Sequence, residues 1–318
     1  MCAEGALEDL PALDAPLAAR RMDALPLCIG LFCIIWSSAF AVAKVALADC
    51  PPLLLLSARF LTAGGAILAV AAVVLPRERF SRLGARDVAA LALMGILNNA
   101  CYLGLSYVGM THVSSGFTAV LISANPLLTA LVAAPLLGER LSGRKVAGLL
   151  LGMAGVALVV RSRIASGHED PTGTLYVLGA LVTLSAATLL FKRIRTSATL
   201  WIGSGIQSLA GGLALLPVAL WREDMADVHL TLPLTLAFSY LTFAGSVGAF
   251  SLWFFILGRT SATRASALHF LMPPLGLMFG WLLLGEKVPL LDLAGVVPIA
   301  LGIRLVTTAP DGRKPQKR

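Results

Sequence analysis

Long apolar runs follow one another along this chain of 318 residues. Most are close to the roughly 20 residues that an α-helix needs to cross a hydrocarbon core about 30 Å thick. Inside such a core the backbone must satisfy its own hydrogen bonds, so only helices and closed barrels span it. The sequence therefore predicts an all-α polytopic membrane protein with ten spans, at about 25–47, 52–75, 88–109, 113–137, 146–160, 174–191, 200–220, 232–257, 265–284 and 290–306.

The composition excludes an ordinary soluble domain. Hydrophobic residues make up 58% of the chain and charged residues 13%, against about 45 to 50% and about 25% in soluble proteins. The loops between the spans are too short to hold a soluble domain. Residues 1–24, which are acidic and polar apart from Arg20 and Arg21, are predicted to be a disordered cytoplasmic segment. Residues 307–318 are predicted to be a basic cytoplasmic tail.

The net charge of +8 is explained by membrane topology. With the N-terminus in the cytoplasm, 18 basic residues fall on the inner side and five, Lys44, Arg161, Arg163, Arg222 and Lys287, on the outer side. This bias follows the positive-inside rule and places both termini in the cytoplasm. Nucleic-acid binding is disfavoured because no basic face is left unexplained.

Motifs for catalysis or metal binding are missing from the sequence. It contains no HExxH, no GxSxG and no paired carboxylates of the kind that a membrane-embedded enzyme needs. The five cysteines have neither metal-ligand nor redox spacing. We therefore expect no enzyme activity, no metal and no cofactor.

One passage occurs twice. Residues 125–140 read NPLLTALVAAPLLGER, and residues 272–287 read MPPLGLMFGWLLLGEK. A shift of 147 residues relates these two passages and also pairs Ala147-Gly148 with Ala294-Gly295, Gly155 with Gly302, Ala63-Gly64-Gly65 with Ala210-Gly211-Gly212, and Ser38-Ala39 with Ser185-Ala186. Spans one to five therefore repeat as spans six to ten.

The repeat has inverted topology, because five is an odd number of crossings. Glu139 is expected to end a helix at the cytoplasmic face, and its counterpart Glu286 to end one at the outer face. This symmetry is most often that of a transporter, whose two near-equivalent halves exchange inward-open and outward-open states around one site.

The residues resemble the EamA-type branch of the drug/metabolite transporter superfamily from about Leu25 to Val306. The resemblance rests on WSSAF in span one, ARF in span two, PLLTALVAAPLLGERLSGRKVAGLLLGMAGV across spans four and five, and SATRASALHFLMPPLGLMFGWLLLGEK across span nine. It implies a ten-helix inner-membrane carrier with five-helix repeats at 25–161 and 174–306. Such carriers usually export amino acids, other small metabolites or drugs.

Polar side chains near the bilayer midplane are the candidate substrate contacts. Such groups are expensive in lipid and must face protein or a watery cavity. They either bind substrate or hydrogen-bond between helices, and both interpretations stay open here. The aromatic residues Trp36 and Trp253 either line the cavity or pack between helices. The predicted substrate-binding set is Arg59, Ser37, Trp36, Asn98, Asn99, Asn125, Gln207, Trp253 and His269.

Arg59 is the most informative single residue. It lies about two helical turns inside span two, where a charge costs about 2.5 to 3.5 kcal/mol on insertion scales. No acidic residue is expected at the same depth. Arg59 therefore either attracts a substrate carboxylate, for which a fixed fork of donors is suited, or satisfies carbonyls and snorkels outward. Lys44 is expected to be a snorkelling anchor.

The matched prolines and glutamates have structural or gating interpretations. Pro126 and the pair Pro273-Pro274 are expected to remove backbone donors in mid-helix and permit bends, and they are the predicted gating residues. Glu139 and Glu286 are expected to be structural and to accept hydrogen bonds at the start of the following helix. Gly148 and Gly152 form a GxxxG pair for packing inside one subunit or, less favoured, for dimerisation.

The predicted function is a secondary transporter, an exporter or exchanger of amino acids or other small metabolites. Its partners are a small-molecule substrate and the inner-membrane bilayer, with a monomer or a homodimer both open. Because the spans hold no mid-membrane Asp or Glu, we expect exchange or downhill transport, with proton coupling through His269 as the rival. Two alternatives stay open, a proton-coupled multidrug exporter of cationic compounds and a membrane scaffold or receptor subunit without flux.

Overall fold

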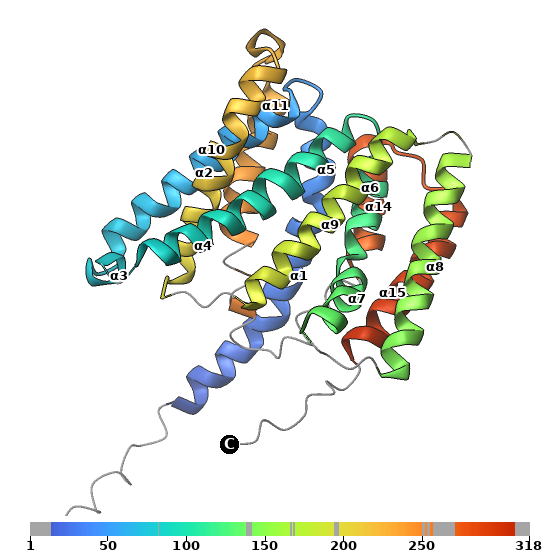
Figure 1. Cartoon of the computed structure of the whole chain (residues 1–318), viewed down its shortest axis with the longest axis horizontal. Coiled ribbons are helices and arrows are strands. Elements are labelled where there is room, and N and C mark those ends of the chain that lie inside the picture. Colours follow the sequence, from blue (N-terminus) through green and yellow to red (C-terminus); the bar gives the residue numbers. More distant parts are fainter. Residues whose placement is uncertain are drawn as a thin grey trace, which may run out of the picture.

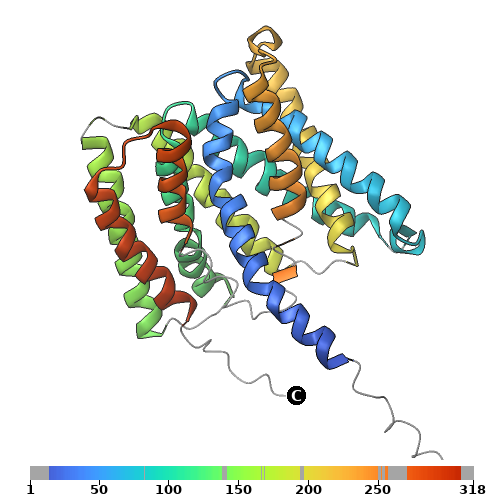
Figure 2. The same ribbon diagram turned by 180° about the vertical axis from the view of Figure 1, so that it is seen from behind.

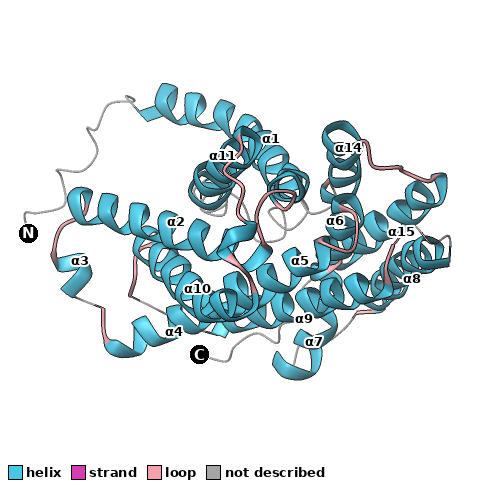
Figure 3. Ribbon diagram, turned by 90° about the horizontal axis from the view of Figure 1, so that it is seen from above, coloured by secondary structure: helices cyan, strands magenta, loops and turns pink. Residues whose placement is uncertain are grey.

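The computed structural model describes residues 14–81, 83–137, 142–165, 167, 169–193, 197–249, 252, 255–256 and 271–308, without the side chains of 14–24, 133–137, 192–193 and 307. In this part the chain is helical and contains no strand (Figure 3). Eight helices are long and apolar enough to cross a membrane, and Met272–Leu284 is a shorter apolar helix. The all-α membrane fold is confirmed. The count of ten spans stays a prediction, because residues 257–270 lie outside the described residues.

The elements follow one another in the order of the predicted spans (Figure 1). They are α1 (Asp14–Ala46), α2 (Pro52–Val74), α3 (Glu78–Ser81), α4 (Ala85–Gly95), η1 (Ile96–Tyr102), α5 (Leu103–Met110), α6 (Ser115–Ser123), α7 (Asn125–Leu137), α8 (Gly143–Ala165), α9 (Pro171–Arg193), α10 (Leu200–Arg222), η2 (Met225–Asp227), α11 (Leu232–Ser239), η3 (Tyr240–Ala249), α14 (Met272–Leu284) and α15 (Leu290–Thr307). The segments η1 and η3 are π-helical, so α4–η1–α5 and α11–η3 each form one continuous rod.

Equivalent helices of the two copies lie antiparallel against each other. A Cβ added to Gly148 of α8 would lie 2.8 Å from the Gly302 carbonyl oxygen of α15, and one added to Gly155 would lie 2.8 Å from that of Gly295. Gly295 and Gly302 are the counterparts of Gly148 and Gly155 after the shift of 147 residues. Helices α2 and α10 meet in the same way, at Gly64 and Gly212. The GxxxG glycines thus pack within one subunit, as the favoured interpretation held.

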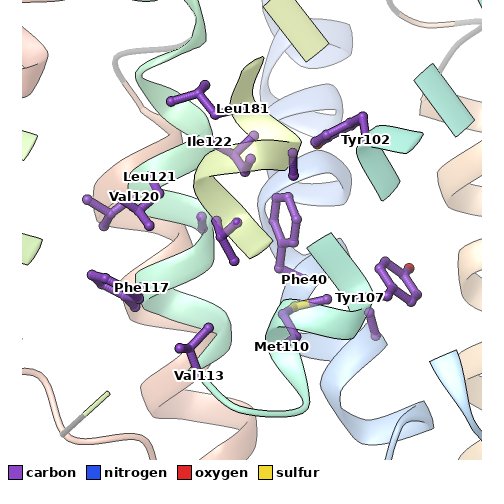
Figure 4. Packing of buried hydrophobic residues seen from close by; sticks show 14 of the residues in the cluster. Phe40, Tyr102, Tyr107, Met110, Val113, Phe117, Val120, Leu121, Ile122 and Leu181 are labelled. Atoms are coloured by element: carbon purple, nitrogen blue, oxygen red, sulfur yellow. The ribbon is translucent and has the colours of Figure 1, made fainter. Parts of the chain in front are cut away.

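Helix α6 occupies the centre of the bundle. All nine of its residues, Ser115–Ser123, are buried, as expected for a helix that is apolar on every side. Figure 4 shows Phe117, Val120 and Leu121 of α6 in the same cluster as Phe40 and Met110. Many large apolar side chains on the other helices are exposed, Leu150 and Val73 among them, which is where lipid would cover the surface.

The start of span one and the middle of span four depart from the sequence-based expectation. Helix α1 begins at Asp14, so residues 14–24 are helical, in keeping with their Ala, Leu and Arg content. The fourth span is two helices, α6 and α7, divided at Ala124.

Pro126 and Pro273, the prolines matched across the repeat, lie in the first turns of helices. Pro126 is the second residue of α7, and Pro273 is the second residue of α14. A missing N–H is harmless in the first turn, where it has no intrahelical partner. Pro126 therefore lies directly after the break that divides span four, and the described part of span nine begins at the proline. Whether these prolines gate a pathway stays a prediction.

The five connections after α1, α5, α8, α10 and α14 gather at one end of the bundle, the upper end in Figure 1. We name it the outer end, following the charge bias. Helix α1 begins and α15 ends at the opposite end (Figure 2), in keeping with an even number of crossings.

Two glutamates of the second copy cap helices of the first copy at the outer end. Glu223 accepts hydrogen bonds from the backbone N–H of Leu53 at 2.9 Å and of Leu54 at 2.7 Å. Glu286 accepts from Ser115 N–H at 2.7 Å and Gly116 N–H at 2.9 Å. Glu286 is thus structural as expected, but it caps α6 and not the following helix. Glu139 lies outside the described residues.

We expect Glu223→Ala to destabilise the protein by about 1 to 2 kcal/mol, because α2 has no side-chain cap of its own and a lost cap costs about that much. The thermal midpoint in detergent should fall by a few degrees. Asp227→Ala, in the same connection and exposed, serves as the control and should leave the midpoint unchanged. An equal fall in both variants would contradict the capping role.

Candidate functional site

Arg59 lies inside the bundle on α2 and is 6% exposed. Its Nε donates to Ser246 Oγ at 3.0 Å, and its Nη1 donates to the Tyr107 hydroxyl at 2.7 Å. Ser246 belongs to η3 of the second copy, while Tyr107 belongs to α5 of the first. The guanidinium therefore lies where the two copies meet.

The two hydrogen-bond partners of Arg59 are neutral hydroxyls, and its guanidinium carbon lies over the Phe60 ring, 5.3 Å from the ring centroid. Within the described part of the chain no carboxylate pairs with it, and its Nη2 makes no hydrogen bond. A Cβ added to Gly245 would lie 3.2 Å from this Nη2, so the third nitrogen points at a place where the neighbouring helix has no side chain. A buried guanidinium with an unused N–H donor is suited to an anionic ligand that binds and dissociates.

The two π-helical segments lie at equivalent positions in the repeat. Asn98 and Asn99 in η1 correspond to Gly245 and Ser246 in η3, 147 residues later. π-helical turns widen a helix locally and are frequent at functional sites. Arg59 of α2 contacts η3, and at the equivalent place in the other copy Asn99 Nδ2 donates at 3.1 Å to the backbone carbonyl of Gln207 in α10. The two π-helical turns thus face α2 and α10.

The other predicted polar residues form separate hydrogen-bonded groups. Asn98 Nδ2 donates to Asn99 Oδ1 at 3.2 Å. Asn125 Oδ1 accepts from Ser185 Oγ at 2.9 Å and from Thr129 Oγ1 at 3.2 Å. These bonds are what the interhelical interpretation predicts, and Asn125 is buried.

Ser37, on α1, has a buried hydroxyl with no hydrogen-bond partner among the described residues. Its neighbour Ser38 is bonded to the Tyr240 hydroxyl at 2.7 Å. In the same part of the chain, the hydroxyl of Thr242, on η3, is also buried without a partner. Trp36 contacts Phe32, with 5.5 Å between ring centroids. Trp253 and His269, the remaining predicted site residues, lie outside the described residues.

A second set of charges lies at the outer end. Arg163, at the end of α8, donates from Nε to Asp292 Oδ2 at 2.6 Å and from Nη1 to Glu169 Oε1 at 3.0 Å. Glu169 in turn accepts from Ser114 N–H at 2.8 Å and from the Ser114 hydroxyl. These groups join α8, α15 and the amino end of α6.

Lys44 also lies at this end, where it binds backbone carbonyls and does not face lipid. Its Nζ donates to the carbonyl oxygens of Met110 and, at 2.9 Å, of Val113. Lys44 therefore ties α1 to the connection between α5 and α6, so the expectation that it snorkels is wrong.

Burial raises the pKa of the Glu169 carboxyl above its usual range, although the bonds from Ser114 and the charge of Arg163 oppose the shift. The Cys50 thiol lies at the same end, on the connection between α1 and α2. Burial, with a smaller effect of Glu223, raises its pKa to about 11. This thiol is therefore unreactive at neutral pH.

Sequence reasoning missed several of these residues. Ser246 had a signal, because it is the repeat counterpart of Asn99. Glu169 and Asp292 lie at the ends of spans, where charged residues are ordinary, and only the packing shows that they are buried. Tyr107 carried no signal that separates it from a structural tyrosine.

The bundle of apolar helices, its internal repeat and its buried polar interior define a polytopic membrane transporter. The chain belongs to the EamA-like transporter family, whose sequence profile matches residues 26–161 and again residues 171–308. The resemblance noted in the sequence is thus confirmed, the protein is a transporter and not an enzyme, and each match covers one copy of the repeat.

Relatives share this architecture along most of their length. The chain is 30% identical over 289 residues to a probable terminal-alkyne amino-acid exporter of Streptantibioticus cattleyicolor, covering 88% of this chain and 92% of that protein. It is 28% identical over 287 residues to a probable amino-acid metabolite efflux pump of Escherichia coli, covering 86% and 91%. A solved crystal structure matches with a TM-score of 0.60 at 22% identity, over 90% of this chain and 96% of the other, which shows the fold.

Proposed function

We propose that this protein is a secondary transporter that exports or exchanges amino acids or other small metabolites that carry a carboxylate. The observation that carries the proposal is Arg59, a buried guanidinium whose hydrogen bonds within the described residues go only to neutral hydroxyls, with its Nη2 directed at Gly245. Burying an unpaired charge costs desolvation free energy unless an opposite charge offsets it. A substrate carboxylate supplies that opposite charge.

The carrier mechanism we propose is alternating access between the two copies of the repeat. The antiparallel contacts of α8 with α15 and of α2 with α10 are those of copies related by a two-fold axis in the membrane plane. With ten spans and both termini in the cytoplasm, each copy would close one side of the membrane in turn. The names of the two relatives given above both refer to amino acids. The proposed substrate class agrees with both names.

The test is counterflow in proteoliposomes loaded with unlabelled compound. The panel pairs labelled leucine, glutamate and lysine with isoamylamine, which is leucine without its carboxylate, and with ethidium as a cationic dye. We expect at least one amino acid to exchange, and isoamylamine not to compete with leucine at equal concentration, because it offers nothing to Arg59. Empty liposomes give the background.

Other outcomes decide against the proposal. Exchange of ethidium and isoamylamine without any amino acid would make the protein an exporter of cations and Arg59 a structural residue. No exchange with any compound, together with no rise in thermal midpoint on adding any of them, would favour a scaffold, because a ligand of the native state must stabilise it.

A further inference from the structure

Arg163, Glu169 and Asp292 form a charged triad sealed inside the outer end. Their side chains are 4%, 1% and 0% exposed. Arg163 lies between the two acids and bonds to both. Charged groups at the outer ends of spans usually reach water, so complete burial of three of them needs an explanation.

The charges of the triad do not balance. One guanidinium faces two carboxylates, which leaves one negative charge in a buried place. Asp292 shows this directly, because its Oδ1 is buried and has no hydrogen-bond partner within the described part of the chain. Burial of an uncompensated charge is costly, so a cation that reaches the two carboxylates would stabilise them.

A proton fits the space better than a metal ion does. Calcium and magnesium require six or more oxygen ligands, whereas a proton requires one carboxylate oxygen. The residues that the structure describes contain no group of three or more acids, histidines or cysteines arranged to hold a metal.

We propose that the Arg163–Glu169–Asp292 triad is a proton-binding site that couples opening of the outer end to the uptake of one proton. The proposal rests on the transport function proposed above and adds the ion that drives it. The two carboxylates bond to one arginine, so a proton bound by either of them is assigned to the pair.

The surroundings make proton binding reversible. Glu169 accepts hydrogen bonds from Ser114 at the amino end of α6, and these bonds favour its ionised form. Burial and the charge of Glu286 act in the opposite direction and raise the pKa of Glu169. The charged and titratable groups around the triad are Lys44 of α1, Glu286 after α14, and the pair His112 and Asp170. The side chains of this pair are about half exposed, and His112 Nδ1 lies 3.4 Å from Asp170 Oδ2. His168 lies outside the described residues.

Proton uptake would act on α6. As an anion, Glu169 holds the amino end of α6 through Ser114 and holds α8 through Arg163. Protonation weakens both interactions, because charge-assisted hydrogen bonds are about twice as strong as neutral ones. Helix α6 leads directly to the break at Ala124, so loosening its outer end frees the centre of the bundle on that side.

The experiment measures accumulation in proteoliposomes, with valinomycin and potassium clamping the membrane potential at zero. The probe is the amino acid with the fastest counterflow. Antiport with one proton should concentrate it about tenfold in a compartment one pH unit more acidic, whichever way the protein is inserted. Pyranine fluorescence in the wild type should report about one proton moved per substrate.

Asp292→Asn leaves one arginine and one carboxylate, a neutral pair without a proton. We expect no accumulation in the acidic compartment. Glu169→Gln should give the same result. Asp170→Asn is the matched control, since it removes an exposed acid one residue away, and it should keep the tenfold accumulation.

The proposal fails if wild-type counterflow occurs but a pH gradient produces no accumulation, or if Asp292→Asn accumulates substrate like the wild type. It also fails if both triad variants keep the wild-type thermal midpoint yet lose counterflow, which would make the triad part of the substrate pathway. Absence of wild-type counterflow with every compound would overturn the transport function instead.

Discussion

Arg59→Ala is expected to lower the counterflow of carboxylate-bearing amino acids at least about 100-fold. Loss of a buried charge pair costs about 3 kcal/mol or more, and each 1.4 kcal/mol is a factor of ten. The counterflow rate of Arg59→Lys should lie between those of the wild type and Arg59→Ala. One ammonium cannot donate to Tyr107, Ser246 and a carboxylate in the planar geometry of a guanidinium. The measurement is the initial rate of counterflow at saturating and at low substrate concentration.

Controls separate binding from folding. Arg222→Ala removes an exposed guanidinium that lies 5.9 Å from the Trp221 ring at the outer end, and it should transport like the wild type. Ser246→Ala and Tyr107→Phe each remove one partner of Arg59 and leave its charge. We expect these two variants to raise KM a few-fold with little change in maximal rate, because they position the guanidinium without touching the substrate.

A structural role for Arg59 makes a different prediction. If Arg59 only fastens α2 to η3 and α5, then Arg59→Ala should lower the thermal midpoint, and every transported compound should lose rate by the same factor. A stable Arg59→Ala protein that still exchanges amino acids at the wild-type rate would rule out the carboxylate site.

The fold followed from the sequence because the signals that set it are local or periodic. Apolar length determines where a helix can cross the membrane, and the shift of 147 residues pairs the two copies without any tertiary information. The glycines at 148 and 302 showed in the sequence as small residues at repeat positions, and the structure shows them in contact.

The site followed less completely, because burial at span ends depends on packing. Lys44 was expected to reach lipid headgroups, yet the carbonyls of Met110 and Val113 are near enough to bind it. Glu286 was expected to serve its own neighbouring helix, but α6 of the other copy begins within reach of its carboxylate. In both cases the nearest partner is distant in sequence, so no local pattern predicts it.

The proposed proton site shows the same limit. At the bilayer midplane the sequence offers only His269 as a titratable group, because it places no acid there. Asp292 and Glu169 look like solvated charges in the sequence, and only their complete burial beside Arg163 distinguishes them from such charges.

Gly302→Ala is expected to destabilise the protein by about 3 kcal/mol, near the upper end for overpacking. A Cβ at Gly302 would lie 2.6 Å from three backbone atoms of α8, the Gly148 carbonyl oxygen and the Cα and N of Gly152. Backbone cannot move aside as a side chain can, so α8 and α15 would have to separate along their whole contact. The thermal midpoint in detergent should fall by several degrees.

The repeat supplies a second variant and the chain supplies a control. Gly155 is the counterpart of Gly302 in the first copy, and its added Cβ would lie 2.8 Å from the Gly295 carbonyl oxygen, so Gly155→Ala should lower the midpoint by a similar amount. Gly65→Ala should leave the midpoint unchanged or raise it, since nothing lies within 4 Å of the added Cβ and alanine favours helix. If Gly302→Ala were as stable as Gly65→Ala, the two helices would not meet backbone to backbone, and the antiparallel pairing of the copies would be wrong at this interface.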